Sequence, residues 1–267
     1  MKTLFLGNCQ INAMRGICRE MFPDRAVDFQ TITPFWGTFD EAKTRELLAG
    51  ADLVVSQAIA NPTTTFNTAD VRAATKGQVV FMPYVYIDGI ASLEIIASKG
   101  KSVIKGASQV LAGQEGRKLI HIFNDYCEGR IDMACEARVI SSLEKMAEKE
   151  AADCDVTISD YLQDTWRRQP TLYGINHPTQ PVVFEMFRRL CQHLGWRYDD
   201  ALAADPVAWG RRALPLGQRA LSPNDVRTLG LQYPADTHWY GQAHKLINLA
   251  MKAAEREAAA SETAGAA

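Results

Sequence analysis

The residues at positions 4–10, Leu-Phe-Leu-Gly-Asn-Cys-Gln, constrain the fold of this chain more than any other stretch. A short apolar run stops at a glycine, and apolar residues then recur at the spacing of one helix face. The residues with that spacing are Ile11, Met14, Ile17, Cys18, Met21 and Phe22. Residues 4–6 are therefore predicted to form a buried strand, Gly7-Asn8 a tight turn, and Cys9 or Gln10 the first turn of a helix.

A thiol thus stands just after the predicted strand. In open α/β sheets, ligands bind at the carboxyl ends of the strands, close to helix N-termini. The positive end of a helix dipole lowers the pKa of a cysteine placed there and favours the thiolate. The alternative is a structural thiol, because free cysteines are usually packed in cores. The amide side chains of Asn8 and Gln10, which flank Cys9, favour a functional role.

Strand and helix patterns alternate up to residue 83, which predicts an α/β fold with a mostly parallel sheet and right-handed crossovers. The further predicted strands are 27–32, 52–56 and 78–82, and the predicted helices are 38–48, opened by a capping-box pattern at Thr38–Glu41, and 70–75. In a parallel sheet, the strand at 52–56 brings Ser56 and Gln57 to the same edge as Cys9. Tyr84 follows the strand at 78–82.

The remainder is predicted to be mainly helical and irregular. Loops and short helices are expected at 88–116, and an irregular connection at 198–235. The predicted helices are 117–127, 131–151, 159–166 and 236–256. The small and polar residues 257–267 are expected to fray.

A second anchor lies at residues 173–179, Tyr-Gly-Ile-Asn-His-Pro-Thr. Thr179 is a good N-cap and Pro181 suits a first helical turn, so a helix is predicted from there to Gly195. Pro178 disfavours the helical region for His177, which is therefore expected to be extended just before that helix. A lone histidine is more often structural than catalytic. His177 is nevertheless a candidate for catalysis, because its position just before a helix could bring a base to the thiol of Cys9.

Composition excludes several classes of protein. A net charge of −2 gives no electrostatic footprint for nucleic acid, and no apolar run approaches the ~20 residues of a membrane span. The first apolar run is too short for the core of a signal peptide, so a cytoplasmic protein is expected. The six cysteines have no C-x-x-C spacing, which favours free thiols, and no paired ligand spacing suggests a metal site.

Cys9 and His177 could form a nucleophile–base pair. The imidazole would need an orienting partner, for which the candidates are Asn176, Asp160 and Asp125. Backbone amides after Gly7 could form an oxyanion hole with help from Asn8, Gln10 or Gln57. A thiol that attacks a thioester exchanges one thioester for another at nearly equal energy, which favours an acyl-CoA over an amide as the donor.

The segments 4–10 and 176–179 together resemble the WcbI-type capsular polysaccharide biosynthesis proteins, and the likeness covers roughly residues 2–195. Val54–Gln57 and Met82–Tyr84 are compatible with that family. The family looks like a divergent relative of the SGNH hydrolases, with cysteine in place of the nucleophilic serine. SGNH enzymes usually carry an aspartate three residues before the histidine, where this chain has Gly174, so the third member of the triad is left open.

This resemblance implies an SGNH-like three-layer sandwich over residues 1–197, a connection and C-terminal helix packed on it over 198–256, and a tail at 257–267. It implies Cys9 as nucleophile and His177 as base, in an acetyltransferase that uses acetyl-CoA to modify a sugar hydroxyl of a surface polysaccharide. Two alternatives remain. One is a thiol esterase or thioesterase with water as acceptor, and the other is a non-catalytic protein that binds CoA or a glycan.

The CoA site is expected from clustered cations and aromatic rings, because the chain has no Walker-type or G-x-G-x-x-G loop. Tyr84, Lys105, Arg167 and Arg168 are the preferred candidates for CoA binding. The other cations and rings considered are Lys101, Arg211, Arg212, Phe35, Trp36 and Tyr86. A solvated surface explains each cation equally well, and core packing explains each ring.

Overall fold

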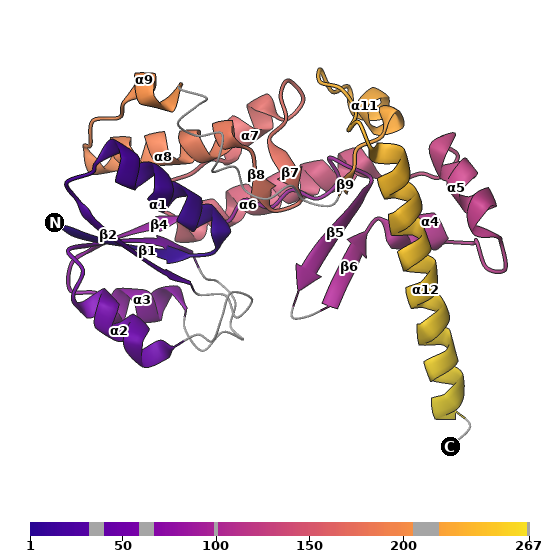
Figure 1. Cartoon of the computed structure of the whole chain (residues 1–267), viewed down its shortest axis with the longest axis horizontal. Coiled ribbons are helices and arrows are strands. Elements are labelled where there is room, and N and C mark those ends of the chain that lie inside the picture. Colours follow the sequence, from indigo (N-terminus) through magenta and orange to yellow (C-terminus); the bar gives the residue numbers. More distant parts are fainter. Residues whose placement is uncertain (32–39, 59–66, 99–100, 205–218, 266–267) are drawn as a thin grey trace. The chain divides into compact units, whose positions relative to one another are not determined.

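The structure is a computed structural model that describes residues 1–31, 40–58, 67–98, 101–204 and 219–265 (Figure 1). Its contacts divide the chain into two compact units. Unit 1 comprises Met1–Tyr86, Leu143–Thr165 and Thr171–Pro215, and unit 2 comprises Ile87–Ser142, Trp166–Pro170 and Leu216–Ala267. Each unit is made of three segments that alternate along the sequence. The predicted boundary between a catalytic domain at 1–197 and a C-terminal part stays a prediction.

Unit 1 is built on a parallel four-stranded sheet of order β2-β1-β3-β4. Its strands are β1 (Lys2–Gly7), β2 (Ala26–Thr31), β3 (Leu53–Gln57) and β4 (Gln78–Met82). The α/β class and the mostly parallel sheet predicted from the alternating pattern are therefore confirmed. Because all four strands are parallel, their carboxyl ends share one edge, and Gly7 and Gln57 both end strands there.

Helices cover both faces of this sheet (Figure 1). On one face, Leu4, Leu6, Val54 and Phe81 pack with Leu48 of α2 (Glu41–Ala49) and Val71 of α3 (Thr68–Ala74). The other face is covered by α1 (Cys9–Met21) and α8 (Gln180–Leu194), which contact each other. Successive side chains of β1 point to opposite faces of the sheet, because a strand is pleated. Since helices cover both faces, β1 is buried on both sides.

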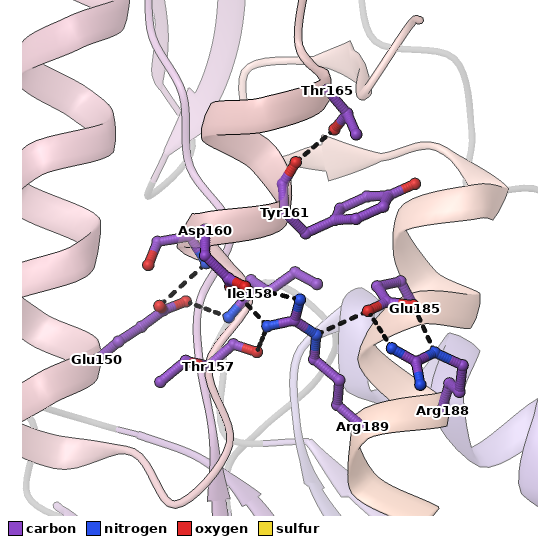
Figure 2. A network of polar contacts seen from close by, with 10 residues as sticks. Glu150, Thr157, Ile158, Asp160, Tyr161, Thr165, Glu185, Arg188 and Arg189 are labelled. Atoms are coloured by element: carbon purple, nitrogen blue, oxygen red, sulfur yellow. Dashed lines mark hydrogen bonds and ion pairs between the residues drawn. The ribbon is translucent and has the colours of Figure 1, made fainter.

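A polar network joins three helices of unit 1 (Figure 2). Glu150 of α6 (Cys135–Asp153) is 1% exposed and accepts the backbone N–H groups of Ile158 and Ser159, both at 3.0 Å, where α7 (Ser159–Thr165) begins. Arg189 of α8 donates to Asp160 and to the carbonyl of Thr157. The helix N-terminus thereby compensates the desolvation of a buried carboxylate.

Unit 2 contains an antiparallel sheet of order β6-β5-β9, formed by β5 (Leu93–Ser98), β6 (Lys101–Lys105) and β9 (Arg219–Ala220). The prediction of loops and short helices over 88–116 was therefore wrong for these two hairpin strands. Charged residues at Glu94, Lys101 and Lys105 interrupt the apolar alternation that would have indicated strands. The helices that belong wholly to unit 2 are α4 (Ala107–Leu111), α5 (Leu119–Cys127), α11 (Pro223–Leu229) and α12 (Trp239–Gly265).

Several predicted helix boundaries need correction, and α6 begins at Cys135 and not at Ile131. The helix α2 is capped by Asp40, whose side chain accepts the N–H of Lys43, so the expected cap at Thr38 was two residues early. The last helix continues past the predicted end at Arg256 as far as Gly265, because its alanine-rich sequence has high helix propensity. Within the described ranges, no helix has the length and hydropathy needed to cross a bilayer.

Candidate functional site

The turn that carries the thiol is fixed by a cap and a close contact. Asn8 caps α1, and its side-chain oxygen accepts the N–H of Gln10 at 2.9 Å. A Cβ atom on Gly7 would lie 2.5 Å from Cγ1 of Ile11, so only glycine fits between the strand and the helix. Cys9 is therefore the first residue of α1, as predicted, and is half-buried.

Gln10 ties this turn to two distant parts of unit 1. Its side chain is 0% exposed, and its Nε2 donates to the carbonyls of Val85 at 2.9 Å and Asn176 at 2.8 Å. Its Oε1 accepts the N–H of Val85 at 3.0 Å. The two segments singled out in the sequence therefore meet, since Cys9 precedes Gln10 and His177 follows Asn176.

His177 lies on a short β-hairpin, formed by β7 (Leu172–Gly174) and β8 (His177–Pro178). Gly174 is the cross-strand partner of His177, so the position where SGNH enzymes usually carry an aspartate offers no side chain. Asn176, at the tip of the hairpin, donates from its Nδ2 to the hydroxyl of Tyr84 at 2.8 Å. The side chain of Asn176 thus fixes the hairpin to the segment after β4, and its backbone carbonyl fixes the hairpin to Gln10 of α1.

Burial decides the protonation of both candidate groups. It raises the pKa of the Cys9 thiol, although the backbone amides of Gln10 and Cys9 act in the opposite direction. Burial also lowers the pKa of His177. At neutral pH the site therefore holds a protonated thiol and a neutral imidazole, so the expectation that the helix dipole favours the thiolate was wrong in direction, because desolvation outweighs it.

Tyr84 completes this cluster from the segment after β4. Burial raises the pKa of its phenol, the hydrogen bond with Asn176 lowers it, and charge on Cys9 raises it. Tyr84 precedes Val85, whose backbone binds Gln10, so the phenol belongs to the same cluster as the Cys9 turn. The residue remains 40% exposed, which leaves it accessible to a ligand.

No hydrogen bond joins Cys9 to His177 among the residues that the structure describes, and none of the three proposed partners hydrogen-bonds to the imidazole. Asp160 is bound by Arg189 (Figure 2). Asp125 belongs to unit 2, where Arg117 and Arg130 bind it. The amide of Asn176 is used by Tyr84.

Gln57 supplies an unused donor at the end of β3. Its side chain is 4% exposed, and its buried Nε2 has no hydrogen-bond partner in the part of the chain that is described. A Cβ built on Gly7 would lie 3.2 Å from the Cβ of Gln57, so the side chain of Gln57 starts beside the turn that leads to Cys9. Ser56 is also buried, but its hydroxyl donates to the carbonyl of Gln57. An unpaired buried donor next to a thiol suits an oxyanion that develops there.

The cations expected to bind CoA lie in unit 2, whereas Cys9 and His177 lie in unit 1. Arg167 pairs with Glu136 and donates to the carbonyl of Leu229, and Lys105 ends β6. A role for Lys105, Arg167 and Arg168 in CoA binding stays a prediction. The other positions considered, Phe35, Trp36, Arg211, Arg212 and the side chain of Lys101, lie outside the described residues.

Sequence reasoning missed Val85, which binds Gln10 through its backbone and so leaves no signal in side-chain chemistry. The described parts of the chain contain no group of three or more His, Cys, Asp or Glu side chains that could hold a metal ion.

Comparisons with known proteins identify the family and a protein of similar fold. The chain matches the family described as polysaccharide biosynthesis enzyme WcbI over residues 2–199. A solved structure of a WcbI, described as the native protein without a disulfide bond between CoA and one of its cysteines, is similar in fold. Its TM-score is 0.60 at 16% sequence identity, over 74% of this chain and 70% of that chain. No curated protein matches the sequence. This chain belongs to the WcbI family of polysaccharide biosynthesis enzymes.

Proposed function

We propose that this protein is an acyltransferase that takes an acyl group, most simply acetyl, from acyl-CoA and transfers it to a sugar hydroxyl of a surface polysaccharide. The observation that carries the proposal is the pair of hydrogen bonds from Gln10 to Val85 and Asn176. Through them, the turn with Cys9 and the hairpin with His177 are held in one region of unit 1, as a shared proton requires.

In the proposed first step, His177 takes the proton of the Cys9 thiol while the sulfur attacks the thioester carbonyl. The carbon–sulfur bond to CoA breaks, CoA leaves as a thiolate that receives the proton, and the acyl group is left on Cys9. In the second step, His177 takes the proton of a sugar hydroxyl, whose oxygen attacks the acyl-enzyme and releases the thiol. A protonated thiol and a neutral imidazole are the starting states that this sequence needs.

Both steps pass through a tetrahedral oxyanion, for which Gln57 is the proposed side-chain donor. Its Nε2 is buried and has no partner among the residues described, so it can donate without first breaking a hydrogen bond to them. The backbone amides at the start of α1 are the second proposed source, because they already lower the pKa of Cys9 by interacting with its charge. Asn8 and Gln10 keep that helical turn in place.

Membership of a family of polysaccharide biosynthesis enzymes supports a sugar as the acceptor. The related WcbI structure is described with CoA, which supports acyl-CoA as the donor. For this chain, binding of CoA and of a saccharide acceptor are both part of the proposal. Tyr84 is the proposed contact for a bound ligand in unit 1, since this residue is partly exposed and its hydroxyl accepts a hydrogen bond from Asn176, next to His177.

The pH profile of the reaction is expected to follow His177. Because burial lowers the pKa of this imidazole from its ordinary 6.5, kcat/KM should rise with pH with a midpoint below 6.5. The thiol ionises only above its ordinary 9.0, so the rate should be flat between about pH 7 and pH 8. Initial rates of CoA release measured across this range test the assignment. A profile that climbs steadily through pH 8 would instead indicate a reaction limited by the thiolate fraction.

Thermal unfolding with ligands tests the donor directly. CoA and acetyl-CoA at about 100 times their dissociation constants should stabilise the protein by about 2.7 kcal/mol, which raises the melting temperature by several degrees. ATP at the same concentration is the control for binding through the adenine nucleotide part of CoA alone. It should raise the melting temperature less than the CoA compounds do. The absence of a shift with either CoA compound contradicts the proposal. Comparing acetyl transfer with CoA release in the absence of an acceptor then separates a transferase from a thioesterase.

The second candidate is a non-catalytic protein that binds CoA or a glycan. It is favoured by one observation, namely that neither a hydrogen bond to Cys9 nor a carboxylate partner is found for His177 in the described ranges. This candidate predicts a CoA-induced thermal shift with no acetyl transfer and no CoA release. The two functions are therefore distinguished by activity, not by binding.

A further inference from the structure

Unit 1 contains a pocket whose lining is rich in arginine and does not include the residues of the Cys9 site. Its volume is about 630 Å³, and it is lined by Arg15 and Arg19 of α1, by Arg25, and by Asp28 and Phe29 of β2. Cys9 begins α1, whereas Arg19 lies near its other end, about 15 Å further along the helix axis. The pocket is therefore distinct from the thiol site.

The three guanidinium groups have no carboxylate partner within ion-pair distance among the described residues, although most other arginines do. Two of them lie over aromatic rings instead. Arg15 lies over the ring of Phe29 at 5.4 Å, and Arg25 lies over the ring of Trp196 at 3.8 Å. Stacking occupies the faces of Arg15 and Arg25 and leaves their N–H edges to hydrogen-bond, and Arg25 uses one N–H for the weak acceptor sulfur of Met1 at 3.9 Å. The Nε of Arg15 is buried, and no hydrogen-bond partner for it is found in the described ranges.

This arrangement is electrostatically unfavourable in the protein alone. Burial lowers the pKa of Arg15, the charge of Arg19 lowers it further, and Asp28 compensates only in part. Like charges spaced four residues apart destabilise a helix. The helix dipole accounts for Arg19 in the last turn of α1, but it does not account for Arg15 or Arg25. A cluster that repels itself and retains an unused donor is suited to a bound anion.

We propose that this pocket binds the phosphate monoester or pyrophosphate group of a phosphorylated ligand. Three arginines and one aspartate leave a surplus of two positive charges, which matches a dianion. The guanidinium fork fits phosphate oxygens in a bidentate manner. A volume of about 630 Å³ accommodates a ligand of the size of a sugar phosphate or a nucleotide.

Isothermal titration of the full chain with sodium pyrophosphate at constant ionic strength tests the proposal. Arg15→Gln and Arg19→Gln should each weaken binding about 10-fold or more, because each removes charge-assisted hydrogen bonds. Arg256→Gln is the matched control, since it removes an equal charge from the exposed surface of α12 and should leave the affinity unchanged. Both pocket variants relieve repulsion within α1, so their melting temperatures without ligand should not fall, and a loss of binding cannot be ascribed to unfolding.

A second titration, with malonate, tests whether the pocket distinguishes phosphate from carboxylate groups. It should bind at least about 10-fold more weakly than pyrophosphate if phosphate geometry is recognised. Equal affinity for the two anions, absence of pyrophosphate binding, or equal weakening by Arg256→Gln would each overturn the proposal. None of these measurements uses an acyl donor, so their outcome is independent of the function proposed for Cys9.

Discussion

Replacing Cys9 by alanine is expected to lower the rate of CoA release from acetyl-CoA at least about 1,000-fold. Without the sulfur no acyl-enzyme can form, and the remaining groups can only bind the donor. The effect can be measured without knowing the acceptor sugar. Wild-type protein mixed with acetyl-CoA should gain the mass of one acetyl group in intact mass spectrometry, and the label should map to Cys9.

Cys154→Ser is the matched control for this variant. Cys154 is another half-buried thiol of unit 1, and burial raises its pKa to about 12, so it is not expected to react. The control should acquire the acetyl group at the wild-type rate. If the Cys9→Ala protein still gains an acetyl group or releases CoA at the normal rate, Cys9 is not the nucleophile. Retention of the CoA-induced thermal shift in Cys9→Ala would show that the variant is folded and still binds.

The strand–turn–helix unit around Cys9 could be predicted because its signals are local. A glycine too crowded for a Cβ, an asparagine cap and a helical apolar period all lie within a few residues of one another. The second anchor is similar, since Thr179, the proline of the first turn and Gly195 define α8 from its ends. Such elements depend on neighbours in the sequence, and the structure confirms both.

The features that could not be predicted depend on distant contacts. The pKa of Cys9 is set by how deeply packing buries the thiol, and no local pattern reports that depth. The partner of Gln10 is the backbone of Val85, which any residue type would supply. Asp160 was a reasonable partner for His177 until Arg189 was seen to bind it (Figure 2). The β5–β6 hairpin was missed because charged residues obscure its alternation.

Gln10→Leu is expected to destabilise the protein by roughly 2–4 kcal/mol. Leucine is similar in size, but it leaves the buried N–H and carbonyl of Val85 without partners and removes the bond to Asn176. Each buried polar group left unpaired costs about 1–3 kcal/mol, which exceeds the gain from an apolar side chain. Chemical denaturation followed by circular dichroism measures the change. The lost connection should also lower kcat, because it lets the hairpin with His177 move away from Cys9.

Gln57→Leu is the matched comparison, because it makes the same substitution at another buried glutamine beside Cys9. Within the described part of the chain, the Nε2 of Gln57 has no partner to lose, so its replacement should leave the free energy of unfolding unchanged or slightly raise it. If this amide donates to the oxyanion, however, kcat should fall about 100-fold or more. The two variants thus separate the amide that holds the site together from the one that acts on the reacting atoms. Equal losses of stability in both would contradict the role assigned to Gln10, and full activity of Gln57→Leu would contradict that of Gln57.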